Sequence, residues 1–179
     1  MKPKQIITTM LLSLMLFAIQ TADAQGNSPF MRQLTGAVQR MQRNGQVLVC
    51  NAKTTKLVVY YSNSSLPEYR PYTMTLDKNG IRLHVECDGR TVHDQLHPYR
   101  GTTFSKVLAK VTKYKIKKSA THGDYLEGAP DESLTAYRGS NAFFKAENQG
   151  GRYNVRGDLD GLLDYLRSLI PNFFEIVDG

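Results

Sequence analysis

Apolar and polar side chains alternate along residues 73–87, and this is the clearest pattern in the chain. Over residues 81–87 one set of side chains falls on one side of an extended backbone and a second set on the other: Ile81, Leu83, Val85 and Cys87 against Arg82, His84 and Glu86. The preceding Asp77-Lys78-Asn79-Gly80 has glycine where a tight turn needs a left-handed backbone. The pattern predicts a β-hairpin with one buried and one solvated face.

Further strands are predicted on both sides of this hairpin. Runs of β-branched and aromatic residues, broken by short polar turns, predict additional strands at residues 46–51, 56–62, 90–93, 142–147 and 152–156. The runs 46–51 and 56–62, and likewise 142–147 and 152–156, are joined by turns too short for crossover connections, so each pair is expected to form an antiparallel hairpin. We expect a single antiparallel sheet of about five to seven strands.

Two segments have the 3.6-residue apolar period of amphipathic helices. The first covers residues 28–44, where Ser28 is the expected N-cap, Pro29 the first helical residue, and Asn44-Gly45 the stop. The second starts at Gly157-Asp158, continues through a run of leucines and ends at Pro171. One apolar face on each helix is available to pack against the sheet.

These elements predict an α+β fold, in which an N-terminal and a C-terminal amphipathic helix pack on the antiparallel sheet. Residues 104–118 fit both helical and alternating spacing, and we expect a helix to about Lys110 followed by a strand. Residues 119–140 are rich in glycine, serine, threonine, aspartate and proline. A loop of this length is uncommon in a compact domain, so we expect it to be mobile or functional.

The N-terminus has the layout of a secretory signal peptide. A charged start with Lys2 and Lys4 precedes an apolar run that is too short and too polar to span a membrane, and Ala22-Asp23-Ala24 resembles a cleavage site. We therefore expect a signal peptide at residues 1–24 and a single exported domain, periplasmic or secreted, at residues 25–179. An N-terminal membrane anchor is the alternative. We expect no transmembrane segment in the mature chain.

The two cysteines, Cys50 and Cys87, both belong to the expected mature domain. An even number of cysteines in an oxidising compartment favours a disulfide. A Cys50–Cys87 bond closing this loop would contribute roughly 4 kcal/mol to stability in the chain-entropy model. It would also leave neither thiol as a nucleophile or a metal ligand.

The chain is basic, with a formal net charge of +7 that falls to +6 once the expected signal peptide, with Lys2, Lys4 and Asp23, is removed. Outside the cytoplasm the acidic partners for such a protein are lipid head groups, glycans and other proteins, and nucleic acid is unlikely as a partner. The charge also has a simpler interpretation, which is that it keeps the domain soluble. Ten tyrosines suit glycan or protein recognition, although tyrosines also complete cores.

The densest positive charge lies within residues 106–118. Its candidate binding residues are Lys106, Lys110, Lys113, Tyr114, Lys115 and Lys117. Lysines with an aromatic residue among them can hold a polyanion or an acidic protein. The alternative is a solvated helix face or an edge strand, where lysine also blocks edge-to-edge pairing.

The sharpest candidate for catalytic chemistry is His93-Asp94-Gln95-Leu96-His97. Two histidines four residues apart on a helix can share a metal, and an acid after the first can act as a base, as in H-E-x-x-H zinc peptidases. The acid here is aspartate, Pro98 follows at once, and the surrounding residues lack a helical pattern. Two loop histidines near a strand end are the simpler interpretation.

A second acidic pair, Asp158-x-Asp160-Gly161, resembles the start of a calcium loop. Leu162 stands where such a loop needs an oxygen ligand, so a helix N-terminus is the favoured interpretation.

The residues favour a non-enzymatic role over catalysis and indicate no cofactor. We expect an exported binding or accessory module that recognises an acidic glycan, protein or lipid partner through residues 106–118 and the 119–140 segment. The alternative function is a metal-dependent hydrolase that uses His93 and His97. A third possibility is a small apolar ligand held between the sheet and the helices.

Overall fold

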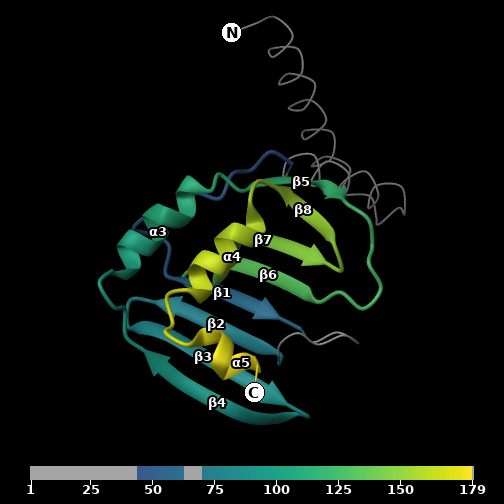
Figure 1. The fold of residues 1–179 in the computed structure, drawn as a ribbon. Coiled ribbons are helices and arrows are strands. Elements are labelled where there is room, and N and C mark those ends of the chain that lie inside the picture. The colour runs from purple at the N-terminus through teal and green to yellow at the C-terminus, as the bar shows by residue number, and fades with distance from the viewer. Residues whose placement is uncertain (1–43, 63–69, 179) are drawn as a thin grey trace, which may run out of the picture. The chain divides into compact units, whose positions relative to one another are not determined.

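The computed structural model describes residues 44–62 and 70–178, which belong to one compact unit starting at Asn44 (Figure 1). Its main feature is one eight-stranded antiparallel sheet, with the spatial order β4-β3-β2-β1-β6-β7-β8-β5. The strands are β1 (Lys56–Tyr61), β2 (Tyr72–Asp77), β3 (Gly80–Cys87), β4 (Arg90–His97), β5 (Lys117–His122), β6 (Asp131–Arg138), β7 (Asn141–Gln149) and β8 (Arg152–Arg156).

Alternation along β1, β2 and β3 determines which face of the sheet is buried. In β3, Ile81, Leu83 and Val85 have no exposed surface, whereas the side chains between them reach solvent. The turn before β3 is closed by the carboxylate of Asp77, which accepts a hydrogen bond from the amide of Asn79 at 2.7 Å. The hairpin predicted from residues 73–87 is present, with β2 and β3 paired antiparallel and Asp77 opposite Gly80.

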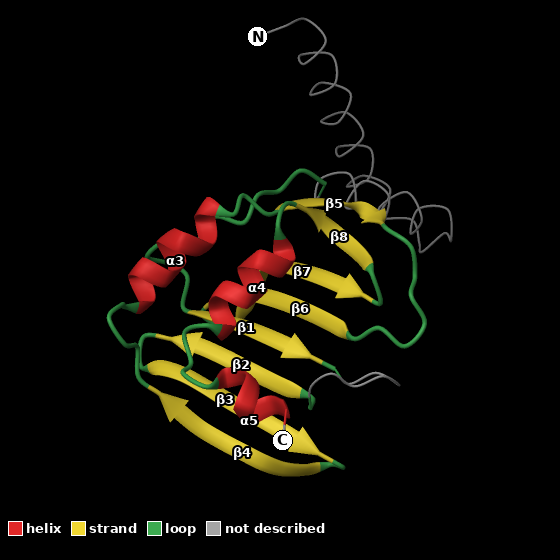
Figure 2. Ribbon diagram, viewed as in Figure 1, coloured by secondary structure: helices red, strands yellow, loops and turns green. Residues whose placement is uncertain are grey.

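Three short helices pack on the sheet: α3 (Phe104–Lys113), α4 (Leu159–Arg167) and α5 (Phe173–Asp178) (Figure 2). Thr103 caps α3 and Asp158 caps α4, each with a side-chain oxygen that accepts an amide hydrogen bond from the first turn. Buried residues from all three helices join the buried strand residues in one hydrophobic core. The leucine stripe predicted at residues 157–170 thus lies in this core.

One charged side chain is buried beside this core. Arg167 of α4 is 7% exposed, and its Nε donates a 2.7 Å hydrogen bond to the hydroxyl of Tyr72 in β2. Its other nitrogens donate to Asp164 and to Glu132 of β6. The guanidinium therefore ties α4 to two strands of the sheet, and its charge is compensated at each end.

The expected α+β architecture is wrong. The described chain is largely β, with one eight-stranded sheet and three short helices, and it is not a sheet packed by an N-terminal and a C-terminal amphipathic helix. The strand count exceeds five to seven because most of β5 and all of β6 lie in the 119–140 segment that was expected to be a loop. The expected N-terminal helix at residues 28–44 falls almost entirely outside the described residues.

The 119–140 segment was wrongly predicted to be a loop because small polar residues occupy buried positions in β6. In β6, four consecutive residues are buried, Ser133 to Ala136, so both faces of this central strand are covered although Ser133 and Thr135 are polar. Only residues 123–130 connect β5 to β6.

The 104–118 segment has the expected order of helix then strand, but α3 continues to Lys113 and the strand starts at Lys117.

The expected Cys50–Cys87 disulfide is absent, since both thiols are free. The register places Lys56, Asp77 and Gly80 at the same end of β1, β2 and β3. Cys50 precedes β1 and lies near that end, whereas Cys87 is the last of the eight residues of β3. An extended strand of this length spans about 25 Å, while a disulfide needs Cα atoms within about 7 Å.

The expected signal peptide at residues 1–24 lies outside the described residues. Within residues 44–62 and 70–178, no helix has the length and apolar character that a membrane span requires.

Candidate functional site

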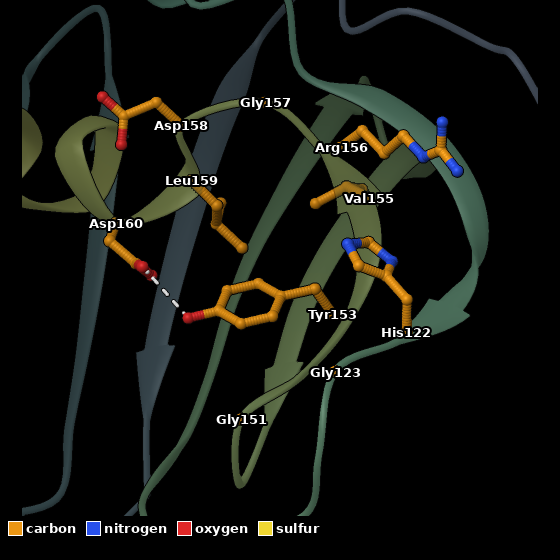
Figure 3. A pocket seen from close by; sticks show the side chains of 10 residues that line it. All are labelled: His122, Gly123, Gly151, Tyr153, Val155, Arg156, Gly157, Asp158, Leu159 and Asp160. Atoms are coloured by element: carbon orange, nitrogen blue, oxygen red, sulfur yellow. Dashed lines mark hydrogen bonds between the residues drawn. The ribbon is translucent and has the colours of Figure 1, made fainter.

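A hollow of about 710 Å³ lies where the end of β5, the strand β8 and the start of α4 meet (Figure 3). His122 comes from β5, and Tyr153 and Arg156 come from β8. Asp158 is the N-cap of α4, and Asp160 lies in its first turn. Its size falls within the range of small-molecule sites, and its lining combines apolar surface with a few polar groups.

A hydrogen bond joins two polar side chains of the hollow. The hydroxyl of Tyr153 donates to a carboxylate oxygen of Asp160 at 3.0 Å, drawn as the dashed line in Figure 3. Burial, together with this carboxylate, raises the pKa of Tyr153 to about 12, so the phenol stays protonated at neutral pH. The ring of His122 lies 6.2 Å from the Tyr153 ring, between centroids. The two rings give the hollow an aromatic side next to an acidic one.

Two glycines let the walls of the hollow approach each other. A Cβ atom added to Gly123 would lie 2.4 Å from the carbonyl oxygen of Gly151. Both glycines have positive φ, 95° and 90° respectively. The segment after β5 is therefore held against the β7–β8 turn in a way that only glycine permits.

Sequence reasoning missed most of this hollow. Asp158 and Asp160 were considered only as a helix start or a calcium loop, and the structure shows Asp158 as the N-cap of α4 and Asp160 bonded to Tyr153. Across the described ranges, no group of three or more His, Cys, Asp or Glu side chains is placed to hold a metal. His122 and Tyr153 carried no signal, because the fold joins segments that are far apart in the chain.

The structure brings the predicted basic residues together on α3 and the start of β5. Lys106, Lys110 and Lys113 follow one another at helical spacing along the exposed side of α3, and Lys115 and Lys117 are exposed beyond it. We call these five residues the lysine surface. Among the residues that the structure describes, none of the five has an ion pair.

Two tyrosines lie beside the lysine surface. The ammonium group of Lys110 is 5.9 Å from the ring centroid of Tyr114 and 5.8 Å from that of Tyr165, and the two rings stack at 6.2 Å. Burial, together with the charges of Asp158 and Asp164, raises the pKa of Tyr114. The acidic side chains of α4 therefore border the lysine surface on the side of Tyr114.

The lysine surface adjoins the hollow. Lys117 pairs with Arg156 across β5 and β8, and Arg156 lines the hollow. Next to it, Gly157 packs on the backbone of Tyr114 and Ile116, the residues between α3 and β5. A ligand in the hollow would therefore be a short distance along the strands from the lysine surface.

His93 and His97 lie on β4, not on a helix, and the structure brings their rings together. Their Nε2 atoms are 3.3 Å apart, with ring centroids at 5.5 Å. Both side chains are half-buried on the side of β4 that faces Val85 and Ile81 in the register with β3. Burial, with added effects of the charges of His93 and Arg100, lowers the pKa of His97.

Asp94, the acid between the two histidines in sequence, is directed away from them. It lies in register with His84, on the opposite side of β4, and Arg82 holds both carboxylate oxygens at 2.7 Å. The hydrogen bonds and charge of Arg82 lower the pKa of Asp94. The arrangement therefore lacks the base that an H-E-x-x-H site places beside its metal.

Comparison with known proteins gives no match for this chain among protein-family models, curated proteins or solved structures.

Proposed function

We propose that this chain is an exported binding module that holds an acidic polysaccharide on the lysine surface. The observation that carries the proposal is that five exposed lysines without an ion pair in the described residues lie close together on α3, the turn after it and the start of β5. Uncompensated charges of one sign on neighbouring elements give a local positive potential that attracts polyanions. Export is part of the proposal and depends on the signal-peptide pattern of residues 1–24.

The neighbourhood of the lysine surface favours a glycan over an acidic protein as its partner. The hollow beside it offers the rings of His122 and Tyr153 and the carboxylate of Asp160. Aromatic faces suit the C–H faces of a sugar ring, and a carboxylate accepts hydrogen bonds from its hydroxyl groups. The carboxylates of Asp158 and Asp160 in the hollow repel anionic groups, so the charged groups of the polysaccharide lie on the lysine surface and an uncharged face of a sugar ring lies in the hollow.

Charge reversal tests the proposal with a matched control. We expect Lys113→Glu, Lys115→Glu and Lys117→Glu together to weaken binding of dextran sulfate at least about tenfold, since each change replaces attraction by repulsion. The control carries the same change in net charge at exposed sites elsewhere: Lys53→Glu, Lys78→Glu and Arg90→Glu.

The two variants differ only in where the charge is lost. Fluorescence anisotropy measures the affinity of both variants for labelled dextran sulfate, with uncharged dextran as a second probe. Equal weakening in the two variants would show that net charge alone attracts the polymer, and the assignment to the lysine surface would then be wrong. Unchanged binding in the first variant would have the same consequence.

A metal-dependent hydrolase that uses His93 and His97 is the weaker candidate. Its two histidines are close together, which supports a metal site, but Asp94 is bonded to Arg82 on the other side of the strand. Hydrolysis at such a site would need a base from outside the motif.

A further inference from the structure

The histidine pair on β4 has a geometry that neither strand pairing nor the lysine surface explains. In an extended strand, residues four apart are separated by about 13 Å along the chain. The side chains of His93 and His97 nevertheless lean toward each other over Gln95, so that their Nε2 atoms are 3.3 Å apart. The ring planes differ by only 18°, and the Nε2 atoms are closer than the ring centroids, so these two atoms face each other.

We propose that His93 and His97 form a two-histidine site for one divalent ion of the copper, nickel or zinc type. Two metal–nitrogen bonds of about 2.0–2.1 Å at a tetrahedral angle place their nitrogens about 3.3 Å apart, which is the separation of the two Nε2 atoms. Imidazole is the preferred ligand of these three ions, whereas Mg²⁺ and Ca²⁺ prefer oxygen.

In the metal-free chain a hydrogen bond accounts for the contact between the rings. One neutral ring donates its Nε2–H and the other accepts it on Nε2. Metal binding needs a free lone pair on both Nε2 atoms, so the donor ring moves its proton to Nδ1 and both rings rotate until the lone pairs converge. No net proton is released when both rings are neutral. Both side chains are only half-buried, which leaves room for this rotation and for water at the remaining ligand positions.

The position on the sheet supports access of an ion from solvent. β4 is an edge strand of the eight-stranded sheet. The charged groups on the other side of β4 are already satisfied, since Arg82 and Asp94 bond to each other. The described chain provides two ligands here and no third acidic or cysteine ligand. The proposed ion therefore keeps open positions, and its affinity is set by the two imidazoles.

Titration of the purified, tag-free chain with CuCl₂, NiCl₂ or ZnCl₂ tests the site. We expect one ion per chain, with Cu²⁺ bound most tightly and no binding of Mg²⁺ or Ca²⁺. Because even an outer-shell partner of a metal site contributes roughly 10–100-fold in affinity, loss of a direct ligand in His93→Gln or His97→Gln is expected to weaken binding at least about tenfold. His84→Gln, on the opposite side of the sheet from His93 and His97, is the matched control and retains wild-type affinity.

A second measurement on the unmodified chain keeps the proposal testable if a variant fails to fold. Histidine side-chain NMR spectra recorded with added Zn²⁺ should show shifts of the His93 and His97 ring signals together, without shifts of the His84 and His122 rings. Equal shifts of all four histidines, or binding that survives in the His93→Gln His97→Gln chain, would overturn the proposal. If the chain does not bind Cu²⁺ at all, the contact between the rings is only a hydrogen bond, and the proposed metal site is wrong.

Discussion

Cys50 is chemically protected by its surroundings, whereas Cys87 is not. The Cys50 side chain is buried near the end of α3, and its backbone amide donates a 3.0 Å hydrogen bond to the hydroxyl of Thr112. Burial raises the pKa of the Cys50 thiol to about 11, although hydrogen bonds from Thr54 and Thr112 oppose the shift. Cys87 lies half-exposed at the end of β3. Since the thiolate is the reactive form, the two residues should differ in reactivity.

We expect iodoacetamide at pH 8 to alkylate Cys87 in the folded chain and to leave Cys50 unmodified. Reaction at Cys50 should increase only as the pH rises toward its pKa of about 11, because the thiolate is scarce below it. Peptide mass spectrometry after timed labelling measures both sites.

The Cys87→Ser chain is the control and should be unreactive until urea unfolds it. Equal labelling of both cysteines in the folded chain would contradict the burial of Cys50. Labelling of Cys87 only after reduction would show that Cys87 is held in a disulfide and would contradict the free thiol.

At the scale of elements, the segment after β5 is attached to the β7–β8 turn through glycines. Gly123 has a φ of 95°, and a Cβ atom there would meet the carbonyl oxygen of Gly151 at 2.4 Å. Gly139, in the turn between β6 and β7, also has a positive φ, 61°, but open space around its Cβ position. Alanine at either Gly123 or Gly139 would have a positive φ, but only alanine at Gly123 would also be forced against another backbone segment.

We expect Gly123→Ala to lower the free energy of unfolding by about 1–3 kcal/mol more than Gly139→Ala, because only the first forces two backbone segments apart. Urea denaturation followed by circular dichroism measures both differences. Similar losses in the two variants would contradict the close approach that forms this wall of the hollow.

The sequence predicts an element well when one face of that element is exposed to solvent and the other is buried. β3 and α4 were anticipated because their polar and apolar positions alternate with the right period. β6 was missed because it is buried on both faces and two of its buried residues, Ser133 and Thr135, are polar. The prediction of a disulfide was wrong because an even number of cysteines does not show at which end of a strand each cysteine lies. The histidine pair was found for the wrong reason, since a strand and not a helix brings its members together.

At the scale of the whole molecule, the five lysines of the lysine surface are distinguished by their closeness to one another on neighbouring elements. The full chain carries 23 lysine and arginine residues against 16 acidic ones. Several basic residues away from the lysine surface have partners, such as Arg82 with Asp94, Lys145 with Glu147 and the buried Arg167 with Glu132. The five lysines lack such partners among the described residues, as do isolated residues such as Lys53 and Lys78, but only the five lie close enough together for their fields to add. The sequence predicted which residues these are, but not that the hollow adjoins them.

A backbone NMR titration of the isotope-labelled chain with a short sulfated dextran oligosaccharide tests most directly whether the lysine surface is the binding site. We predict that the amide signals of Lys106 to Lys117 shift first and saturably, followed by those of His122 and Tyr153 in the hollow. The amide signals of β4, at the opposite edge of the sheet from β5, should not shift. Shifts concentrated on β4 or on the sheet face away from the helices, with the α3 amides unchanged, would contradict the proposed function.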